Sequence, residues 1–423
     1  MQPVIETTPP AYFGSLTIEN VKCFKGEQTI DLSDGNGKPA MWTVILGNNN
    51  TGKTTLLMCL AYLEPIETKI ESKDYMHRRF MPKAHIKNSL VRNTHSIRCN
   101  FIIGNSMSSS VFMWERYSNT PLDNFYVSRP SISVDENLNN AIVYGYGTSR
   151  KMGKSTLSDN EEQDNTESLF DDNVTLTNTE EWLLQTFFAE KLNKPKAAET
   201  LERIKKVLIS GILPDVQDFR FDTTPDFKGF VEVKTDYGWV KLRELGYGYQ
   251  VTLAWIVDLA KKLFERYPNS ENPLHEPAIV LIDELDLHLH PDWQRKIINF
   301  LSEQFPHTQF IATTHSPLIV QSADNINLVM LEKQDDHVII KQRPDIKTFK
   351  GWTVDEILTE LMGMDNKTLS DDYLTWMHQF DDALDEDNYH NAKQAYDELD
   401  KILHPESHQR KLLRIQMSSL VAE

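Results

Sequence analysis

Apolar residues along the chain fall into short continuous runs and longer helical stripes. Short, largely apolar runs occupy 42–46, 279–282 and 309–313, and such runs are typical of parallel strands buried on both faces. The segments 196–209 and 251–264 instead repeat their apolar residues at helical spacing. Buried strands and helices in this arrangement predict an α/β fold, with a central mixed or parallel sheet flanked by helices.

Other segments have the patterns of antiparallel strands and loops. Residues 219–221 and 230–234 alternate, Tyr237-Gly238 predicts a hairpin turn into 239–242, and 326–331 with 338–341 predict two more strands. A helix is expected at 179–188, capped by Thr179. The stretch 155–180 is rich in Ser, Asp, Asn, Glu and Thr, and we expect it to be a mobile acidic loop. Beyond Trp352 the pattern is mostly helical.

The run at 42–46 leads directly into a phosphate-binding pattern. Residues 47–54 read Gly-Asn-Asn-Asn-Thr-Gly-Lys-Thr, a full match to G-x-x-x-x-G-K-[ST], and 55–61 open a predicted amphipathic helix. The glycines let backbone amides surround a phosphate, Lys53 reaches the β- and γ-oxygens, and the Thr54 hydroxyl holds Mg²⁺. The alternative is an accidental glycine turn. We therefore expect ATP or GTP to be bound by Gly47, Asn48, Asn49, Asn50, Thr51, Gly52, Lys53, Thr54 and Thr55.

A second pattern adds the chemistry of hydrolysis. The apolar run 279–282 ends in Asp283-Glu284, and a parallel strand would deliver both carboxylates to the sheet edge where nucleotides bind. Asp283 would hold Mg²⁺, and Glu284 would polarise the attacking water. The alternative is a strand that ends in a solvated acidic turn, but the phosphate-binding pattern favours the catalytic interpretation.

The residues after Glu284 resemble a known family. Leu285-Asp286-Leu287-His288-Leu289-His290-Pro291 and, after the next strand, Thr314-His315-Ser316-Pro317 are similar to segments of the ABC-type ATPases that include the RecF, SMC and OLD proteins. The resemblance implies that His315 senses the γ-phosphate and that Asp286 lines a dimer interface. His288 and His290 suggest a metal pair, but the three cysteines lie far away without paired spacing, so we interpret both histidines as structural.

The same family carries a signature segment, which completes the ATP site of a second subunit. The matching segment is 245–250, Leu-Gly-Tyr-Gly-Tyr-Gln, where Gly246 and Gly248 would let a helix N-terminus approach a phosphate. Gly246 stands where the family usually has serine, which puts fast hydrolysis in doubt but not the sandwiching of ATP between two chains. The alternative is a glycine-rich turn before a core helix.

Two further residues are assigned to the nucleotide site by resemblance alone. Lys22 follows a predicted first strand at 16–21, where the family commonly has arginine. Arg150 follows the predicted strand and loop at 143–149, from which this branch of the family places an arginine near the nucleotide.

Composition limits the partners and the compartment. The chain has 423 residues, 40% of them hydrophobic, three cysteines and no apolar stretch of membrane-spanning length, so we expect a cytoplasmic protein without a membrane partner. A formal net charge of −18 argues against nucleic-acid binding by the whole surface. Nucleic acid would be bound through a complex or through a local basic patch, whose candidates are Lys73, His77, Arg78, Arg79, Lys83, His85, Lys87 and Arg92. The alternative for this patch is a solvated loop.

The C-terminal tail carries no set of acids with nuclease spacing. A compact ABC-type ATPase with such a tail, which starts at Thr353-Val354-Asp355-Glu356-Ile357-Leu358, resembles the ATPase subunits of Septu anti-phage systems, found also in some retron systems. That resemblance implies ATPase dimers and a separate HNH nuclease as partners. The alternatives are a RecF-like DNA-repair ATPase and an ATP-gated assembly scaffold with negligible hydrolysis.

We accordingly expect five segments. These are an N-terminal part of the ATPase head with the phosphate loop (1–65), strands and a basic loop (66–150), an acidic loop with inserted helices (151–215), the C-terminal part of the head (216–345), and a partner-binding helical tail (346–423).

Overall fold

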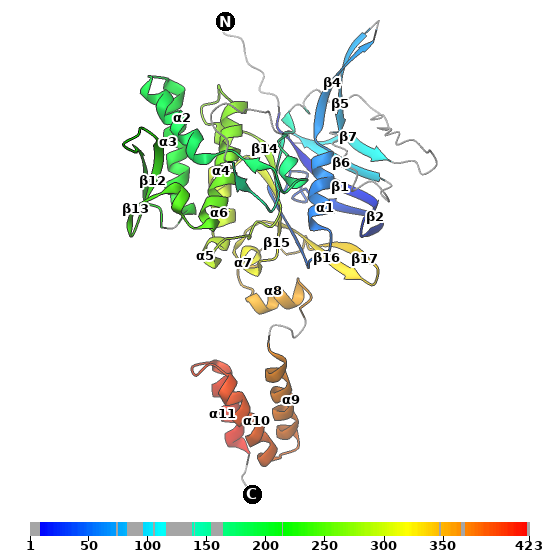
Figure 1. The fold of residues 1–423 in the computed structure, drawn as a ribbon. Coiled ribbons are helices and arrows are strands. Elements are labelled where there is room, and N and C mark those ends of the chain that lie inside the picture. Colours follow the sequence, from blue (N-terminus) through cyan, green and yellow to red (C-terminus); the bar gives the residue numbers. More distant parts are fainter. Residues whose placement is uncertain are drawn as a thin grey trace. The chain divides into compact units, whose positions relative to one another are not determined.

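The computed structural model describes residues 9–72, 75–82, 96–104, 106–115, 138, 140–153, 164–213, 215–346, 348–364 and 369–420 (Figure 1). For 66–72, 75–82, 106–115, Ile212 and Ser419 the description covers the backbone only. The chain divides into two compact units, 1–354 and 355–423. Unit 1 holds all the sequence patterns expected to bind nucleotide.

A six-stranded sheet forms the centre of unit 1, in the order β17-β16-β3-β15-β14-β8. Its strands are β3 (Trp42–Gly47), β8 (Val143–Tyr146), β14 (Ala278–Ile282), β15 (Thr308–Thr314), β16 (Asn327–Gln334) and β17 (His337–Gln342). All neighbouring pairs are parallel except β16 with β17. Because parallel strands end at one edge of a sheet, the segments that follow β3, β8, β14 and β15 meet there.

A second sheet covers one side of the first. It is antiparallel, in the order β2-β1-β6-β7, from β1 (Ala11–Val21), β2 (Phe24–Asp31), β6 (Ser96–Ile103) and β7 (Ser106–Glu115). Helix α1 (Lys53–Tyr62) shares one apolar cluster with both sheets. The predicted amphipathic character of this helix is wrong, because seven of its residues are buried and the rest are at least partly covered.

A hairpin of β4 (Pro65–Ser72) and β5 (Tyr75–Pro82) follows α1. The candidate basic patch falls on this hairpin and on residues 83–95, so its side chains lie outside the described part of the chain. Nucleic-acid binding through this patch stays a prediction.

The expected acidic loop is partly folded. Residues 154–163 lie outside the described part, but 164–178 contain η2 (Glu167–Leu169) and β10 (Thr175–Leu176), which pairs with β9 (Lys151–Met152). Ser168 and Leu169 are buried, and the Ser168 hydroxyl donates to Gly145 O at 2.7 Å. The prediction of a mobile loop is therefore wrong for 164–178, because these few apolar and hydroxyl side chains anchor it.

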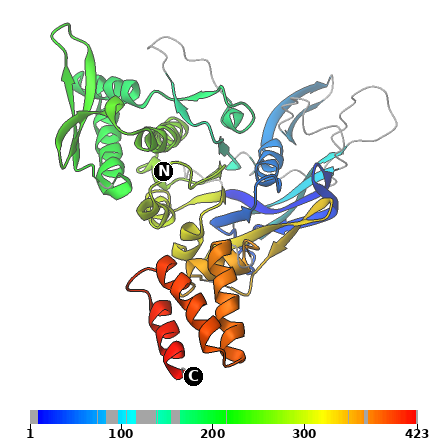
Figure 2. The ribbon, with the colours of Figure 1, turned by 60° about the horizontal axis from the view of Figure 1, so that its bottom comes forward.

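Helices α2 (Thr179–Lys191) and α3 (Pro195–Val207) continue through η3 (Leu208–Ile212) into a three-stranded antiparallel sheet, β11 (Asp218–Thr223), β12 (Gly229–Thr235) and β13 (Gly238–Lys241). The cap of α2 is Asn178 and not Thr179, since the Asn178 side chain accepts from the Glu181 amide. After η4 (Leu242–Glu244) the long helix α4 (Tyr247–Arg266) lies between this group and the six-stranded sheet (Figures 1 and 2).

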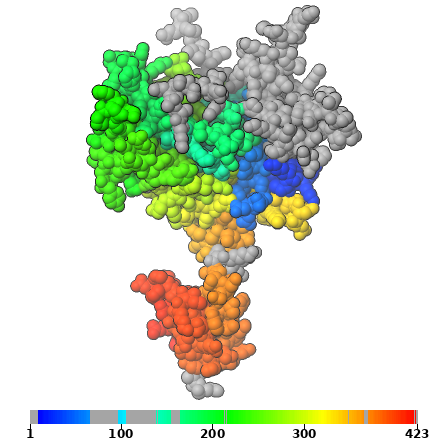
Figure 3. Space-filling view, in the orientation of Figure 1, coloured from blue at the N-terminus to red at the C-terminus, as the bar shows by residue number. Residues whose placement is uncertain are grey.

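Short helices complete unit 1: η5 (Pro273–His275), α5 (Pro291–Gln294), α6 (Ile297–Gln304) and α7 (Pro317–Ser322). Unit 2 consists of α8 (Val354–Glu360), α9 (Asp371–Asp385), α10 (Tyr389–Ile402) and α11 (His408–Ser419). Helices α9 to α11 pack around Phe380, Leu399 and Leu413, and the space-filling view shows this C-terminal group, at the orange to red end of the colour bar, as a closely filled body (Figure 3). The predicted α/β class and the predicted helical tail are both confirmed.

Candidate nucleotide site

The phosphate loop turns sharply between β3 and α1. Asn50 and Gly52 have φ values of 64° and 89°, in the left-handed region that favours glycine. A Cβ at Gly52 would lie 2.7 Å from Cys23 Sγ, and a Cβ at Gly47 would lie 2.5 Å from Thr51 Oγ1. Both glycines are therefore required by close contacts.

The middle of this loop is exposed to solvent, and its end is held by burial and a hydrogen bond. Asn48, Asn49 and Asn50 are exposed, whereas Thr51 and Thr55 are buried. Thr51 Oγ1 donates to Asn48 O at 2.8 Å. Helix α1 begins after Gly52, which provides no side-chain cap, so its first amides are available to bind an anion such as a phosphate.

The Lys53 side chain is hydrogen-bonded to its own phosphate-binding loop. Its Nζ donates to Gly47 O and to Asn48 O, both at 2.9 Å. Burial lowers the Lys53 pKa, and the carboxylates of Asp283 and Glu284 oppose that shift. An ammonium that has little water around it and several carboxylates nearby interacts strongly with an incoming phosphate.

Asp283 and Thr54 meet across the sheet. Thr54 Oγ1 donates to Asp283 Oδ2 at 2.7 Å, and Thr313 Oγ1 donates to Asp283 Oδ1 at 2.6 Å. A hydroxyl and a carboxylate are the hard oxygen ligands that Mg²⁺ takes in nucleotide sites, so this pair fits the expected ion. Thr313 was missed in the sequence analysis, although a hydroxyl at the end of a buried strand was the available signal.

Glu284 leaves the strand in an unusual backbone conformation. Its φ is 51°, and its amide donates to Thr313 Oγ1 at 2.7 Å. Glu284 is half-buried, while Asp283 is 3% exposed. The two neighbouring acids therefore differ: one is anchored inside the protein, and the other stands at the edge, where water and a phosphate can reach it.

His315 lies beside this edge. Its amide donates to Asp286 Oδ1 at 3.2 Å, and Thr314 Oγ1 donates to the same oxygen. Its Nε2 is buried without a hydrogen-bond partner among the described residues. Burial, and secondly Lys53, lower the His315 pKa, so the ring is neutral near pH 7. Asp286, expected at a dimer interface, here joins the segment after β14 to the turn after β15.

The candidate signature segment packs on the segment that follows Glu284. Gly246 is the residue before α4, and it offers no side-chain cap. A Cβ at Gly248 would lie 2.5 Å from His288 O, so only glycine fits there. The exposed Tyr247 ring meets the His288 ring edge-on at 5.0 Å. The two segments expected to face a second subunit are thus neighbours in one chain.

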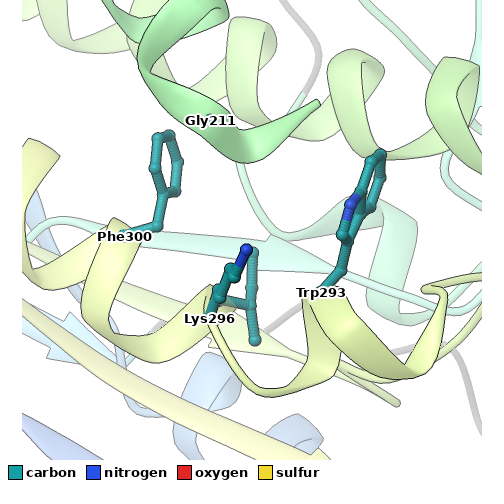
Figure 4. Close-up of a pocket in the computed structure, with 5 residues that line it drawn as sticks. Gly211, Trp293, Lys296 and Phe300 are labelled. Carbon is teal, nitrogen blue, oxygen red and sulfur yellow. The ribbon is translucent and has the colours of Figure 1, made fainter. Parts of the chain in front are cut away.

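A small cavity is lined by Gly211, Trp293, Lys296, Ile297 and Phe300 (Figure 4). Its volume of about 10 Å³ is far below that of a ligand pocket. None of its lining residues is among those assigned to the nucleotide site.

The two residues assigned by resemblance alone lie in different settings. Lys22 is exposed in the turn between β1 and β2, next to Cys23, whose thiol lies 3.6 Å from Thr51 O. Arg150 is buried, and its guanidinium donates to backbone carbonyls of Gly147, Asp283 and Glu284. Its Nε and Nη2 are thus engaged by the protein, and the expected contact of Arg150 with the nucleotide stays a prediction.

The two histidines near the site have local roles. His288 contacts Tyr247, and His290 Nδ1 accepts from the Asp292 amide at the start of α5. Within the described ranges no group of three His, Cys, Asp or Glu side chains is placed to hold a metal ion. The described helices also include none that is long and apolar enough to cross a membrane.

The chain is similar to several known proteins. Residues 42–321 match a family model described as "AAA domain, putative AbiEii toxin, Type IV TA system". The Septu protein PtuA of Bacillus thuringiensis is 34% identical over 242 residues, which are 56% of this chain and 60% of that protein. The Septu protein PtuA of Bacillus mycoides (strain KBAB4) is 27% identical over 356 residues, 82% of this chain and 44% of that protein.

A retron Ec83 probable ATPase of Escherichia coli is 33% identical over 181 residues, 42% of this chain and 31% of that protein. The chain thus matches less than two thirds of the length of each of these relatives. Among solved structures, an SMC head bound to the C-winged helix domain of ScpA aligns with a TM-score of 0.45 and 15% identity, covering 78% of this chain and 97% of that chain.

The phosphate loop, the Asp-Glu strand and the Thr-His-Ser-Pro turn at one edge of a mostly parallel sheet define an ABC-type ATPase head. The chain belongs to the AAA family that matches residues 42–321. Within that family it resembles the Septu protein PtuA and the retron ATPases.

Proposed function

We propose that this chain binds and hydrolyses ATP as the regulatory subunit of an anti-phage complex, in which a separate HNH nuclease does the cutting. The observation that carries the ATPase part is the hydrogen bond between Thr54 and Asp283, 2.7 Å long and 229 residues apart in sequence. It brings the phosphate loop and the acidic strand into one site. The defence part is supported by the names of the relatives.

Each residue of the site has a separate role in the proposed hydrolysis. Lys53 exchanges its bonds to Gly47 O and Asn48 O for bonds to phosphate oxygens when ATP enters. Mg²⁺, held by Thr54 and Asp283, neutralises phosphate charge when bound. Glu284 orients the attacking water and accepts its proton. His315, neutral and with an unpartnered Nε2, is suited to contact the γ-phosphate, because a neutral ring nitrogen can donate or accept.

We place the partner surface of the helical tail at later residues than expected. One expected partner surface in this tail is the apolar stripe of Leu358, Leu361 and Met362. Leu361 and Met362 are buried at 5% and 9% exposure, so the expectation is wrong for these two residues. The large apolar residues that remain exposed on α10 and α11 are Ile402, Leu412 and Ile415. We therefore assign the nuclease dock to α11 and the end of α10.

One observation favours an alternative, an ATP-gated scaffold that hardly hydrolyses. Gly246 is the residue before α4 and supplies no hydroxyl, so the signature segment stabilises the γ-phosphate with backbone groups alone. Such a scaffold would assemble when ATP binds, and its rate of ATP hydrolysis would be no higher with Glu284 than without it. Steady-state ATPase assays of the wild type and of Glu284→Gln, together with phage-protection assays of both, separate the two functions.

A further inference from the structure

Arg150 is among the largest fully buried side chains of the described chain, with 2% of its surface exposed. It ends the turn that follows β8, and its own φ is 31°. Its Nε donates to Gly147 O at 2.8 Å, and one terminal nitrogen, Nη2, donates to Glu284 O at 2.8 Å and also to Asp283 O. A single guanidinium therefore ties the end of β8 to the end of β14.

The convergence of two successive carbonyls on one nitrogen has a backbone cause. In a regular strand, neighbouring residues point in opposite directions. The left-handed conformation of Glu284, with φ of 51°, breaks this alternation and brings the carbonyls of Asp283 and Glu284 to the same side. A non-glycine residue holds such a conformation only when its surroundings fix it.

The surroundings of Glu284 fix it from both ends of the residue. Thr313 Oγ1 accepts its amide proton at 2.7 Å, and Arg150 donates to its carbonyl. Its carboxylate has no hydrogen bond to the described part of the chain, and it therefore remains available at the edge of the site. The backbone is restrained while the reactive group is left unpaired.

The guanidinium keeps its full set of donors at neutral pH. Burial lowers the Arg150 pKa to about 10, against the opposing effect of the carboxylates of Asp283, Asp286 and Glu284. The side chain is therefore charged at pH 7. A buried cation is costly unless it is paired and hydrogen-bonded, and here the three carbonyls and the nearby acids supply the compensation.

We propose that Arg150 is a positioning residue for hydrolysis: by holding the carbonyls of Asp283 and Glu284, it fixes the left-handed turn that aims the Glu284 carboxylate. In this role it acts through the backbone and needs no contact with the nucleotide. This inference rests on the proposed ATPase function, and it adds a residue whose part in the reaction differs from that of the phosphate-binding groups.

The kinetic test is Arg150→Lys in the full-length chain, with Arg150→Gln beside it. Lysine keeps the charge but can reach only one carbonyl. We expect kcat to fall by about 100-fold with lysine, because a small misplacement of the Glu284 carboxylate costs that much. With glutamine kcat should fall further. KM for ATP should stay within about threefold of the wild type. Adding Arg150→Lys to Glu284→Gln should slow turnover no further. A wild-type kcat, or a loss that appears only in KM, would overturn the proposal.

A matched control separates positioning from general destabilisation. Gln309 is fully buried at the start of β15, where its amide group bonds Phe13 N and Phe13 O at 2.9 Å each. Gln309→Met should lower the unfolding midpoint as Arg150→Lys does but leave kcat near the wild-type value. If both variants lose kcat in proportion to their stability, the role of Arg150 is only structural.

Amide hydrogen exchange gives a readout that needs no turnover. In Arg150→Lys, a peptide spanning 283–287 should exchange at least about tenfold faster than in the wild type, while peptides from β1 should not change. If the wild type hydrolyses no faster than Glu284→Gln, the proposed hydrolysis fails, and the exchange result still decides the role of Arg150. Unchanged exchange at 283–287 would refute it.

Discussion

Thr54 and Asp283 are joined by a hydrogen bond of 2.7 Å although 229 residues separate them in the sequence. Thr54 lies in the first turn of α1, and Asp283 directly follows β14, with β15 between β3 and β14 in the sheet. Thr313 at the end of β15 donates to the other oxygen of the same carboxylate. The site is thus built from three separate strand ends, and a change at any of them reaches the same carboxylate.

Lys53→Ala should abolish nucleotide binding. The ammonium is buried, and its hydrogen-bond partners among the described residues are two carbonyls of its own loop. Losing two charge-assisted bonds should weaken ATP affinity by at least about 100-fold, roughly 3 kcal/mol. Titration with a fluorescent ATP analogue measures this, and an affinity equal to that of the wild type would disprove the role of Lys53.

ATP should be held between two chains. We expect Gly248 and the start of α4 to face residues 47–54 of a second copy. Subunits with Lys53→Ala and with Gly248→Arg should each be inactive, and a mixture should regain part of the activity, because a mixed dimer contains one site with both faces intact. Each single variant at the same total concentration is the control. No recovery in the mixture would indicate a site made by one chain.

The stability of unit 1 should depend on pH through His315. Burial lowers its pKa in the folded chain, so the unfolded chain takes up the proton at higher pH, and stability falls as the pH drops through about 6.5. His315→Gln should therefore lose less stability than the wild type between about pH 7.5 and pH 5.5. Urea unfolding at the two pH values measures the difference, and equal losses would contradict a lowered pKa.

The dock for the nuclease should be lost when the exposed apolar residues of α11 become charged. Leu412→Asp with Ile415→Asp should prevent co-purification of the HNH nuclease while ATP binding stays unchanged. Thr375→Asp, also exposed but on α9, is the matched control and should keep the nuclease. Equal recovery of the nuclease with the wild type, the double variant and the control would place the dock elsewhere.

The sheet and the phosphate loop could be predicted because their patterns are local. A continuous apolar run predicts a buried strand, and the glycines of the phosphate-binding pattern predict a tight turn. The structure has these strands at the runs 42–46 and 279–282, and it has the turn at Gly47 and Gly52. The amphipathic assignment of α1 failed because a helix between two sheets is covered on nearly every side. Periodicity within one segment does not show how many neighbours that segment has.

The settings of Arg150, Thr313 and Leu361 could not be predicted from the sequence. Two of the three carbonyl partners of Arg150 are 133 and 134 residues away, and the pairing of β8 with β14 brings them together. Thr313 became important because Glu284 adopts a left-handed turn that no local pattern announces. Leu361 has the same apolar side chain whether it binds a partner or is buried in its own chain.

The most direct test is the ATPase rate of Glu284→Gln against the wild type, with nucleotide affinity measured on the same preparations. Glutamine keeps the shape but cannot accept the proton of the attacking water, so turnover should fall by about 100- to 10,000-fold. ATP affinity should stay within about threefold, because Lys53 and the phosphate loop are intact. Turnover at the wild-type rate in Glu284→Gln would contradict the assignment of this site as the place of hydrolysis.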